Sequence, residues 1–463
     1  MCSKVNSRAD SLSVCGLAAS REGGKSVSQT ISRRNLLASF PSLPLFSTTQ
    51  RPPNFLLIFS DDQGFHDLSC YGSEIPTPHI DSIARHGVKF ANFYVAGPVC
   101  TPSRYGLLTG KYPARSRDRL LGALMPHSTK GIHPGETTIA EVLSDHGYRT
   151  ALIGKWHLGA SRREFFPTRH GFQSFDGFVH GCIDYFNFTH GGLKSWYKNE
   201  TLFQPHGYTT DYLTDQALQF LKANHRRPFF LYLAYNAPHY GKTSYDPITR
   251  KARDELQAPE SYIARFSHIA DKNRRLYAAT IASLDDNIGR LLRALRELQL
   301  ESNTLVVFLS DNGGSLSYGG SNQPLRGEKG DLFEGGIHVP CLMQWKGMLP
   351  GGAVLTQVAG AVDLFPTMAS LAGVTTKNLA LDGYNIARVL FEGYTFDREL
   401  FWRTANADAY LLGRWKYIRI ADGREFLFDL EHDPTEQHNR IDDRHRLQLL
   451  LEGYKRIKSS LCA

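Results

Sequence analysis

The sequence lacks the features that mark several common classes of protein. No segment of the 463 residues approaches the roughly 20 consecutive apolar residues of a membrane-spanning helix, so we expect no stable membrane insertion. The seven cysteines are scattered and contain no CxxC pair, which argues against a zinc site and against a dense disulfide framework. Basic runs interleaved with aromatic residues are also missing. Nucleic acid is therefore not an expected partner.

The composition instead indicates a folded protein with a large hydrophobic core. With 41% hydrophobic residues, the chain can bury the core of one large domain and a smaller one. Residues 1–50 contain six Lys/Arg and two Asp/Glu, so this segment supplies +4 of the formal net charge of +8. The mild positive excess that remains favours an anionic small substrate or a polysaccharide.

The first 50 residues have the character of a leader. Arg33 and Arg34 precede a modest apolar stretch that ends near Ser47, an order that resembles a twin-arginine export signal. We therefore expect export to the periplasm or secretion from a bacterium, with the mature chain starting near residue 50. The alternative is an ordinary basic terminus, because the apolar stretch contains two prolines.

Two compact apolar runs, 54–60 and 304–310, end in the same way. Each is followed directly by oxygen-bearing side chains: Asp61 and Asp62 after the first run, Asp311 and Asn312 after the second. Carboxylate and amide oxygens select calcium or magnesium over zinc. Either motif alone would be compatible with a turn in which side chains bond backbone amides. Both together, after similar strands, predict a divalent metal site.

Two further apolar runs predict the fold class. Residues 148–154 lead to Lys155 and His157, and residues 228–239 end at His239. Runs that are apolar on both faces are typical of parallel strands covered by helices, and helical patterns over 137–147 and 277–298 lie between them. The sequence thus predicts an α/β fold with a central, mostly parallel sheet. Ligands bind at the carboxyl ends of such strands, so we expect all four strand ends to meet at one site.

Cys100 lies beside a predicted helix. We expect this helix to start near Pro102, directly after the cysteine, and to stop at Gly110. The amides and dipole of a helix N-terminus attract anions, and Arg104 adds a positive charge one turn in, which suits a thiolate or a bound oxyanion. A buried, inert cysteine is the alternative.

Cys100, Pro102 and Arg104 match the C-x-P-x-R signature, and the chain resembles the type I, formylglycine-dependent sulfatases of the alkaline phosphatase superfamily, with an arylsulfatase A/B-like character. The resemblance covers nearly the whole chain after residue 50. Further motifs follow in the family's order: DDQGFHDLSCYG (61–72), GKWHLG (154–159), APH (237–239), SDNGG (310–314) and EKGDLFEGG (328–336).

The resemblance implies a covalent mechanism. Cys100 would be oxidised to formylglycine (3-oxoalanine) by a formylglycine-generating enzyme, and its hydrated aldehyde would attack the sulfur of a sulfate monoester. Calcium, or magnesium in its place, would be bound by Asp61, Asp62, Asp311, Asn312 and the modified residue 100.

The other motif residues acquire roles by the same resemblance. Lys155, Lys329 and His239 would hold the sulfate oxygens, and Arg104 would steady the geminal diol. His157 would be the base that removes the second hydroxyl's proton. His239 would protonate the leaving oxygen, with Asp311 as the alternative.

The substrate is less defined. The stretch 319–336 looks most like arylsulfatase B and related enzymes acting on sulfated glycans, so we expect a sulfated saccharide or an aryl sulfate. Pocket walls are expected in the region 177–190, with four candidate substrate contacts: His180, Asp184, Tyr185 and His190. Cys70 is interpreted as a packing residue. The alternative functions are a phosphodiester or phosphonate monoester hydrolase on the same fold and a non-catalytic binder of sulfated glycans.

The expected architecture has two folded parts after the leader (1–50). Residues 51–395 would form an alkaline-phosphatase-like catalytic domain with helices on both faces of its sheet. Residues 396–463 would form a small α+β domain, in which short strands between 399 and 431 make an antiparallel sheet and residues 444–461 a closing amphipathic helix.

Overall fold

A computed structural model describes residues 51–245 and 252–461, and the chain from residue 51 onward forms one compact unit. The predicted leader lies outside the described residues. Ten strands form the central sheet in the order β15-β2-β14-β13-β1-β10-β4-β5-β8-β9. Their bounds are β1 Asn54–Asp61, β2 Val88–Phe90, β4 Arg149–Lys155, β5 Ser174–Phe178, β8 Trp196–Lys198, β9 Thr201–Leu202, β10 Phe229–Pro238, β13 Thr304–Ser310, β14 Cys341–Gln344 and β15 Ala353–Leu355.

The middle of this sheet is parallel and its margins are mixed. Strands β13, β1, β10, β4 and β5 run parallel to one another. At the margins, β14 pairs antiparallel with β13 and with β2, and β8 pairs antiparallel with β5 and β9. Every residue of β1, β10 and β13 is buried. The predicted α/β class with a mostly parallel sheet is therefore confirmed.

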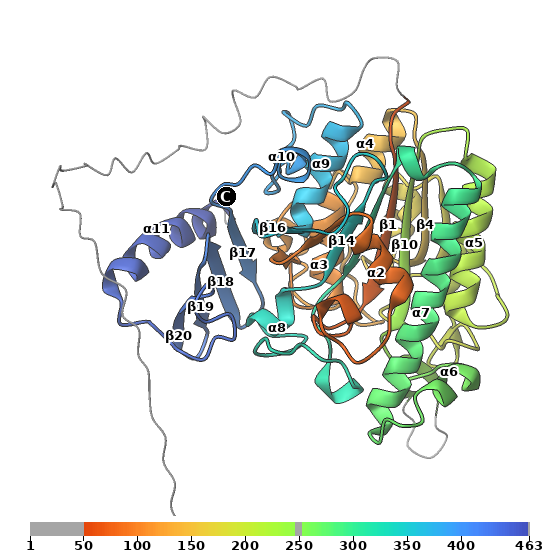
Figure 1. Ribbon diagram of the computed structural model, residues 1–463, viewed down its shortest axis with the longest axis horizontal. Coiled ribbons are helices and arrows are strands. Elements are labelled where there is room, and N and C mark those ends of the chain that lie inside the picture. Colours follow the sequence, from red (N-terminus) through yellow and green to blue (C-terminus); the bar gives the residue numbers. More distant parts are fainter. Residues whose placement is uncertain (1–50, 246–251, 462–463) are drawn as a thin grey trace, which may run out of the picture. The chain divides into compact units, whose positions relative to one another are not determined.

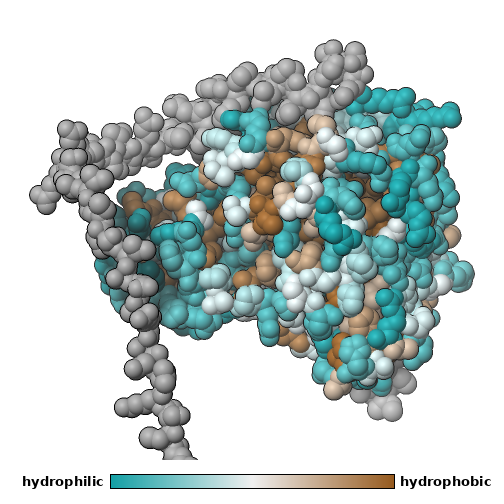
Figure 2. All heavy atoms as spheres, in the orientation of Figure 1, coloured by the Kyte–Doolittle hydropathy of each residue, from teal (hydrophilic) through white to brown (hydrophobic). Residues whose placement is uncertain are grey.

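Helices cover both faces of the sheet (Figure 1). One layer contains α2 (Pro78–Arg85), α5 (Thr209–Asn224) and α7 (Lys272–Glu297), with α6 (Glu260–Arg265) against α7. The other contains α3 (Cys100–Thr109), α4 (Ile139–Asp145) and α9 (Leu364–Leu371). The outer surface of the α5 and α7 side is largely hydrophilic (Figure 2), as expected for helices that bury a single stripe. None of the described helices is both long and apolar enough to span a membrane.

Short elements join these layers. They comprise the strand pairs β3 (Phe93–Tyr94) with β16 (Ala359–Gly360), β6 (Thr189–His190) with β7 (Leu193–Lys194) and β11 (Gly241–Tyr245) with β12 (Ala252–Glu255), and the helices α8 (Glu334–Ile337) and α10 (Ala387–Glu392). Helix α7 begins at Lys272, earlier than the pattern 277–298 predicts, because the Asp271 side chain accepts a hydrogen bond from the Arg274 amide.

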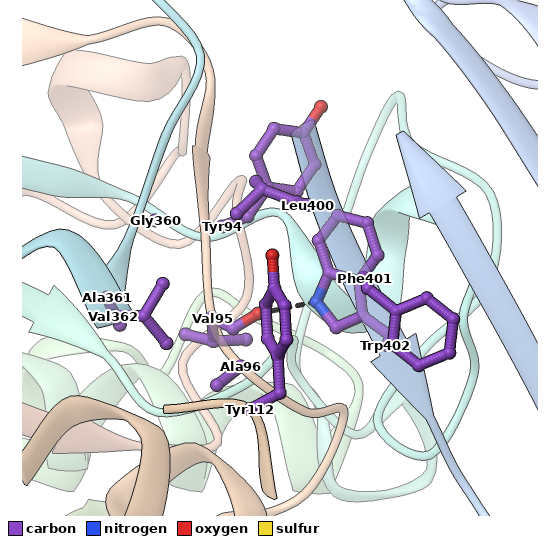
Figure 3. A pocket seen from close by; sticks show the side chains of 10 residues that line it. All are labelled: Tyr94, Val95, Ala96, Tyr112, Gly360, Ala361, Val362, Leu400, Phe401 and Trp402. Carbon is purple, nitrogen blue, oxygen red and sulfur yellow. Dashed lines mark hydrogen bonds between the residues drawn. The ribbon is translucent and has the colours of Figure 1, made fainter. Parts of the chain in front are cut away.

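The C-terminal part has the predicted antiparallel sheet and closing helix. The sheet consists of β17 (Glu399–Arg403), β18 (Ala407–Leu412), β19 (Trp415–Ile420) and β20 (Glu425–Asp429), and α11 (Arg444–Ser460) packs on it. Trp402 fixes this sheet to the larger part, since its indole Nε1 donates to the Val95 carbonyl at 2.6 Å (Figure 3). The division into domains 51–395 and 396–463 stays a prediction.

Candidate active site

The sheet register brings the four predicted strand ends together. β1 lies between β13 and β10, with Ser60 opposite Ser310 and Asp61 opposite Pro238, and β4 is the next strand beyond β10. Because these strands are parallel, the residues that follow them share one edge of the sheet. Side chains far apart in the sequence meet there, as in the contact between Asn312 and Asp62, which are 250 positions apart.

The acidic and amide residues form one buried group. The Asp62 amide donates to Asp311 Oδ1 at 3.0 Å, and Asn312 Nδ2 donates to Asp62 Oδ1 at 2.8 Å. Asn312 Oδ1 is buried and has no hydrogen-bond partner. One ligand atom from each of Asp61, Asp62, Cys100 and His239 lies within 4.8 Å of the others. This oxygen-rich set and the unpartnered Asn312 Oδ1 fit a hard divalent cation.

Cys100 is the first residue of α3, so the helix starts slightly earlier than the position of Pro102 predicts. The thiol is buried, and its Sγ lies 3.2 Å from Lys155 Nζ and 3.5 Å from Asp61 Oδ1. Burial raises the pKa of the Cys100 thiol well above its ordinary value, although Lys155 opposes this shift. A thiolate nucleophile is therefore disfavoured in the unmodified chain. The helix ends at Gly110, as predicted, with a φ of 65° that suits glycine.

Arg104 lies one turn into α3 and is fully buried. Its guanidinium donates to Asp311 Oδ2 at 2.9 Å and to the Lys155 carbonyl at 3.1 Å. It also lies 3.8 Å from Asp61 Oδ1 and stacks over the Phe59 ring. Arg104 thus connects the nucleophile's helix to the carboxylates at the ends of β1 and β13.

Two lysines balance the carboxylates. Lys155 Nζ donates to Asp61 Oδ2 at 2.5 Å, and Lys329 Nζ donates to Asp62 Oδ2 at 2.6 Å. Burial and the neighbouring Asp311 raise the pKa of Asp61 to about 8, whereas Lys329 holds the pKa of Asp62 below its ordinary value against the effect of burial. A bound cation would favour the ionised form of Asp61.

The two histidines have defined hydrogen bonds. His239 Nδ1 lies 2.8 Å from the Tyr240 carbonyl, which leaves Nε2 facing Lys329 Nζ at 3.2 Å. His157 Nε2 lies 2.8 Å from the Leu124 carbonyl, and His157 Nδ1 is buried without a partner. Since Nε2 carries the proton toward a carbonyl, Nδ1 is the basic atom of the neutral His157 ring.

The family model described as Sulfatase matches residues 53–374. The chain belongs to the sulfatase family. Arylsulfatase J of Mus musculus is 35% identical over 353 residues, which cover 74% of this chain and 56% of that protein. Arylsulfatase A of Homo sapiens is 34% identical over 452 residues and is matched over 84% of both chains. This sulfatase-family chain therefore spans little more than half the length of one relative and most of the other.

Solved structures agree with this family. The crystal structure of Ps i-CgsB in complex with k-i-k-neocarrahexaose superposes with a TM-score of 0.80 and 32% sequence identity, and the match covers 89% of this chain and 93% of that chain. The resemblance to type I sulfatases and the alkaline-phosphatase-like fold are thus confirmed.

The predicted pocket residues of this sulfatase-family chain have different environments. His180 and His190 are half-buried, with ring centroids 5.1 Å apart. Asp184 is buried and accepts hydrogen bonds from two amides of its own loop. The Tyr185 hydroxyl, also buried, donates to the His239 carbonyl at 2.8 Å. Asp184 and Tyr185 therefore support the loop and His239, and direct contact of the four residues with substrate stays a prediction.

Three features of the site were missed from the sequence. Leu124 offers a backbone carbonyl to His157, and Gly181 packs so closely that an added Cβ would lie 2.8 Å from His157 Cε1. Tyr185 supports His239 from a strand-free loop. A backbone acceptor and a close glycine have no distinctive sequence signal. Cys70, by contrast, packs against the main core as expected, and burial raises its thiol pKa.

Proposed function

We propose that this chain hydrolyses sulfate monoesters of a sulfated saccharide or an aryl alcohol, using formylglycine at position 100 and a divalent cation. The observation that carries the proposal is the position of Cys100: it starts α3 and contacts both Lys155 and Asp61 in one buried site. A geminal diol there would lie among cations that attract a sulfate anion and carboxylates that attract a metal.

The chain's own cations prepare this site for the substrate. Lys155, Lys329 and His239 would hold the sulfate oxygens, which offsets the repulsion between an anionic ester and an oxygen nucleophile. Asp61, Asp62, Asp311, Asn312 and residue 100 would hold calcium, or magnesium, and the metal would supply positive charge at the sulfate oxygens and the nucleophile.

The modified residue divides the work between two hydroxyls. One oxygen of the hydrated formylglycine would attack sulfur and displace the alcohol of the ester. Loss of the other hydroxyl's proton would then break the bond between the carbon of residue 100 and the sulfate oxygen, which releases sulfate and restores the aldehyde. His157 is the proposed base for that proton, because its Nδ1 is free while Nε2 is bonded to Leu124. Arg104 orients the diol from within the same helix.

His239 is the better candidate for protonating the leaving oxygen. Both carboxylate oxygens of Asp311 are occupied, Oδ1 by the Asp62 amide and Oδ2 by Arg104. The His239 Nε2 atom lies 3.2 Å from Lys329 Nζ and 3.4 Å from Asp62 Oδ2, and the Tyr240 carbonyl fixes the other ring nitrogen. We therefore place the general acid at His239, whose Nε2 must first take up a proton. Burial lowers the pKa of this ring to about 3, and a bound sulfate anion would raise it.

Maturation and location complete the proposal. A formylglycine-generating enzyme is the expected partner that modifies Cys100, and residues 1–50 would direct export to a periplasmic or extracellular compartment. Two other functions would fit the fold: phosphodiester or phosphonate monoester hydrolysis, and binding of sulfated glycans without turnover. A comparison of hydrolysis rates on an aryl sulfate and on a phosphodiester distinguishes the sulfatase from the phosphodiester or phosphonate monoester hydrolase. Any release of sulfate excludes the non-catalytic binder.

The deciding experiment is mass spectrometry of the tryptic peptide from Phe90 to Arg104. The protein should come from its own host or from co-expression with a formylglycine-generating enzyme, and a Cys100→Ala variant provides the control. We expect an aldehyde at position 100 and nitrophenyl sulfate hydrolysis that the variant lacks. An unmodified thiol in fully active protein would overturn the proposed mechanism.

A further inference from the structure

The loop of residues 116–131 presents cations that the fold does not use. Arg117, Arg119 and Lys130 are exposed, and within residues 51–245 and 252–461 their charged groups form no ion pair or side-chain hydrogen bond, although Lys130 interacts electrostatically with Asp118. Arg119 adopts a φ of 50°, a left-handed conformation that a non-glycine residue keeps only when its surroundings enforce it. The loop therefore has a constrained backbone at Arg119 and exposed cationic side chains.

The one acidic residue of this loop is already bound within the fold. Asp118 Oδ2 accepts a hydrogen bond from the Gly131 amide at 2.9 Å, and Asp118 Oδ1 lies 3.0 Å from His133 Nε2. These contacts tie the start of the loop to its end. Asp118 is thus bonded within the fold and interacts with Lys130, and the three cations against this one carboxylate leave the loop a formal charge of +2.

The middle of the loop is attached to the site. The Leu124 amide donates to Thr101 Oγ1 at 3.1 Å, and the Leu124 carbonyl lies 2.8 Å from His157 Nε2. Thr101 follows Cys100 in α3, and its hydroxyl also donates to the His157 carbonyl at 2.9 Å. Leu124 therefore contacts both the start of α3 and His157, which places loop 116–131 against the wall of the site.

We propose that loop 116–131 binds additional sulfate groups of a polysulfated polysaccharide while one sulfate is cleaved at position 100. This inference rests on the proposed function and names the substrate class as a polyanionic polymer. Unpaired cations beside a site attract such a polymer, and salt screens the attraction. A small aryl sulfate carries its only charge at the reacting group and gains nothing from the loop.

Charge-removing variants test this inference with a matched control. The loop variant is Arg117→Gln/Arg119→Gln/Lys130→Gln. The control is Lys222→Gln/Arg293→Gln/Arg296→Gln, which removes three exposed cations from the last turns of α5 and α7. Those turns precede β10 and β13, so they lie toward the amino ends of the strands, away from the site edge. Both variants change the net charge equally.

The binding probe is dextran sulfate, with neutral dextran as the blank, in a Cys100→Ala background that prevents turnover. Exposed ion pairs each contribute roughly a factor of two at low ionic strength, so the loop variant should bind dextran sulfate about tenfold more weakly. The control variant should change by less than about twofold, and added salt should reduce the difference. With Cys100 present, nitrophenyl sulfate kcat/KM should be the same in the loop variant and the unaltered protein.

Each other outcome overturns the inference. Unchanged dextran sulfate binding would show that the loop does not contact the polymer, and an equal loss in both variants would show attraction by net charge alone. A parallel loss of nitrophenyl sulfate turnover would show that the loop acts through His157. If the unaltered protein hydrolyses no sulfate ester, the proposed function fails, and the dextran sulfate measurement still decides the role of the loop.

Discussion

Lys416 provides a strong test of how the C-terminal sheet supports the site. Its side chain is fully buried, with Nζ 2.7 Å from Glu334 Oε1 and 3.0 Å from Glu436 Oε1. The Glu334 amide donates to Glu436 Oε2 at 2.7 Å, and Tyr94 donates to Glu334 Oε2 at 2.8 Å. Lys416→Met replaces the side chain by an apolar one of similar length and removes its positive charge. Two carboxylates would then lie close together without the lysine, and Glu334 would keep only its neutral donors and the contact of its Oε2 with His338 Nδ1 at 3.0 Å.

The cost follows from the burial of this group. Removing one partner of a buried ion pair typically destabilises a protein by about 3–5 kcal/mol. With an unfolding entropy of about 2 cal/mol/K per residue over roughly 400 ordered residues, this corresponds to a fall in Tm of about 4–6 °C. Differential scanning calorimetry measures the shift. Adding Glu436→Gln should restore part of the loss, because it removes one of the two opposed charges.

Lys458→Met is the matched control. Lys458 also pairs with a carboxylate, Asp408, at 3.0 Å, but its side chain is 42% exposed, so its loss should cost at most about 1 kcal/mol. If Lys416→Met lowers the Tm no more than Lys458→Met does, the ion pair with Glu334 does not hold the two parts together, and the reasoning is refuted.

Three other perturbations give distinct expectations. Chelation should abolish sulfate release and lower the Tm, and calcium at a hundred times its Kd should restore about 2.7 kcal/mol of stability in the unaltered protein but not in Asp61→Asn. Gly181→Ala, which crowds His157, should reduce kcat well below that of Gly122→Ala, whose added Cβ meets nothing within 4 Å. Burial lowers the pKa of His170 from 6.5 to about 4, so as the pH falls the unfolded chain takes up the proton before the folded chain does. The neutral buried ring thus contributes about 3 kcal/mol of stability above pH 6.5, and this contribution should be lost between pH 6.5 and pH 4. Denaturant titrations at several pH values should show that the free energy of unfolding depends less on pH in His170→Gln than in the unaltered protein. The first expectation is contradicted if calcium does not change the stability of the unaltered protein. The second is contradicted if Gly181→Ala and Gly122→Ala have the same kcat.

The sequence predicted the site best where residues directly follow a parallel strand. Parallel strands place their carboxyl ends at one edge, so Asp61 and Asp311 could be assigned to one site without knowledge of the loops between them. The start of α3 was predicted less well, since Cys100 and Thr101 already belong to the helix before Pro102. Pro102 is compatible with the first turn but does not fix the helix start.

Contacts made by ordinary residues were not predictable. Lys416 is one of three consecutive buried residues of β19, and the sequence does not show that its ammonium reaches Glu334, 82 positions earlier. The same applies to the Leu124 carbonyl and to Gly181, because a backbone acceptor or a missing side chain leaves no pattern. Asp184 stays a predicted substrate contact, and the sequence did not show that its carboxylate accepts hydrogen bonds from amides of its own loop.

The position of Lys329 connects these observations. Its loop is closed by the Gly335 amide, which donates to the Arg326 carbonyl at 2.7 Å, and it is anchored where Arg326 donates to the Glu436 carbonyl at 2.9 Å. Glu436 also accepts from the Glu334 amide at the start of α8. The loop that carries Lys329 is therefore held from two sides. Beside the site, the Lys329 amide donates to the Gly314 carbonyl at 3.2 Å and the Gly330 amide donates to the Pro98 carbonyl at 2.9 Å. Further along the loop, Arg326 and the Glu334 amide bond to Glu436 of the C-terminal part, so contacts with both parts position the ammonium that pairs with Asp62.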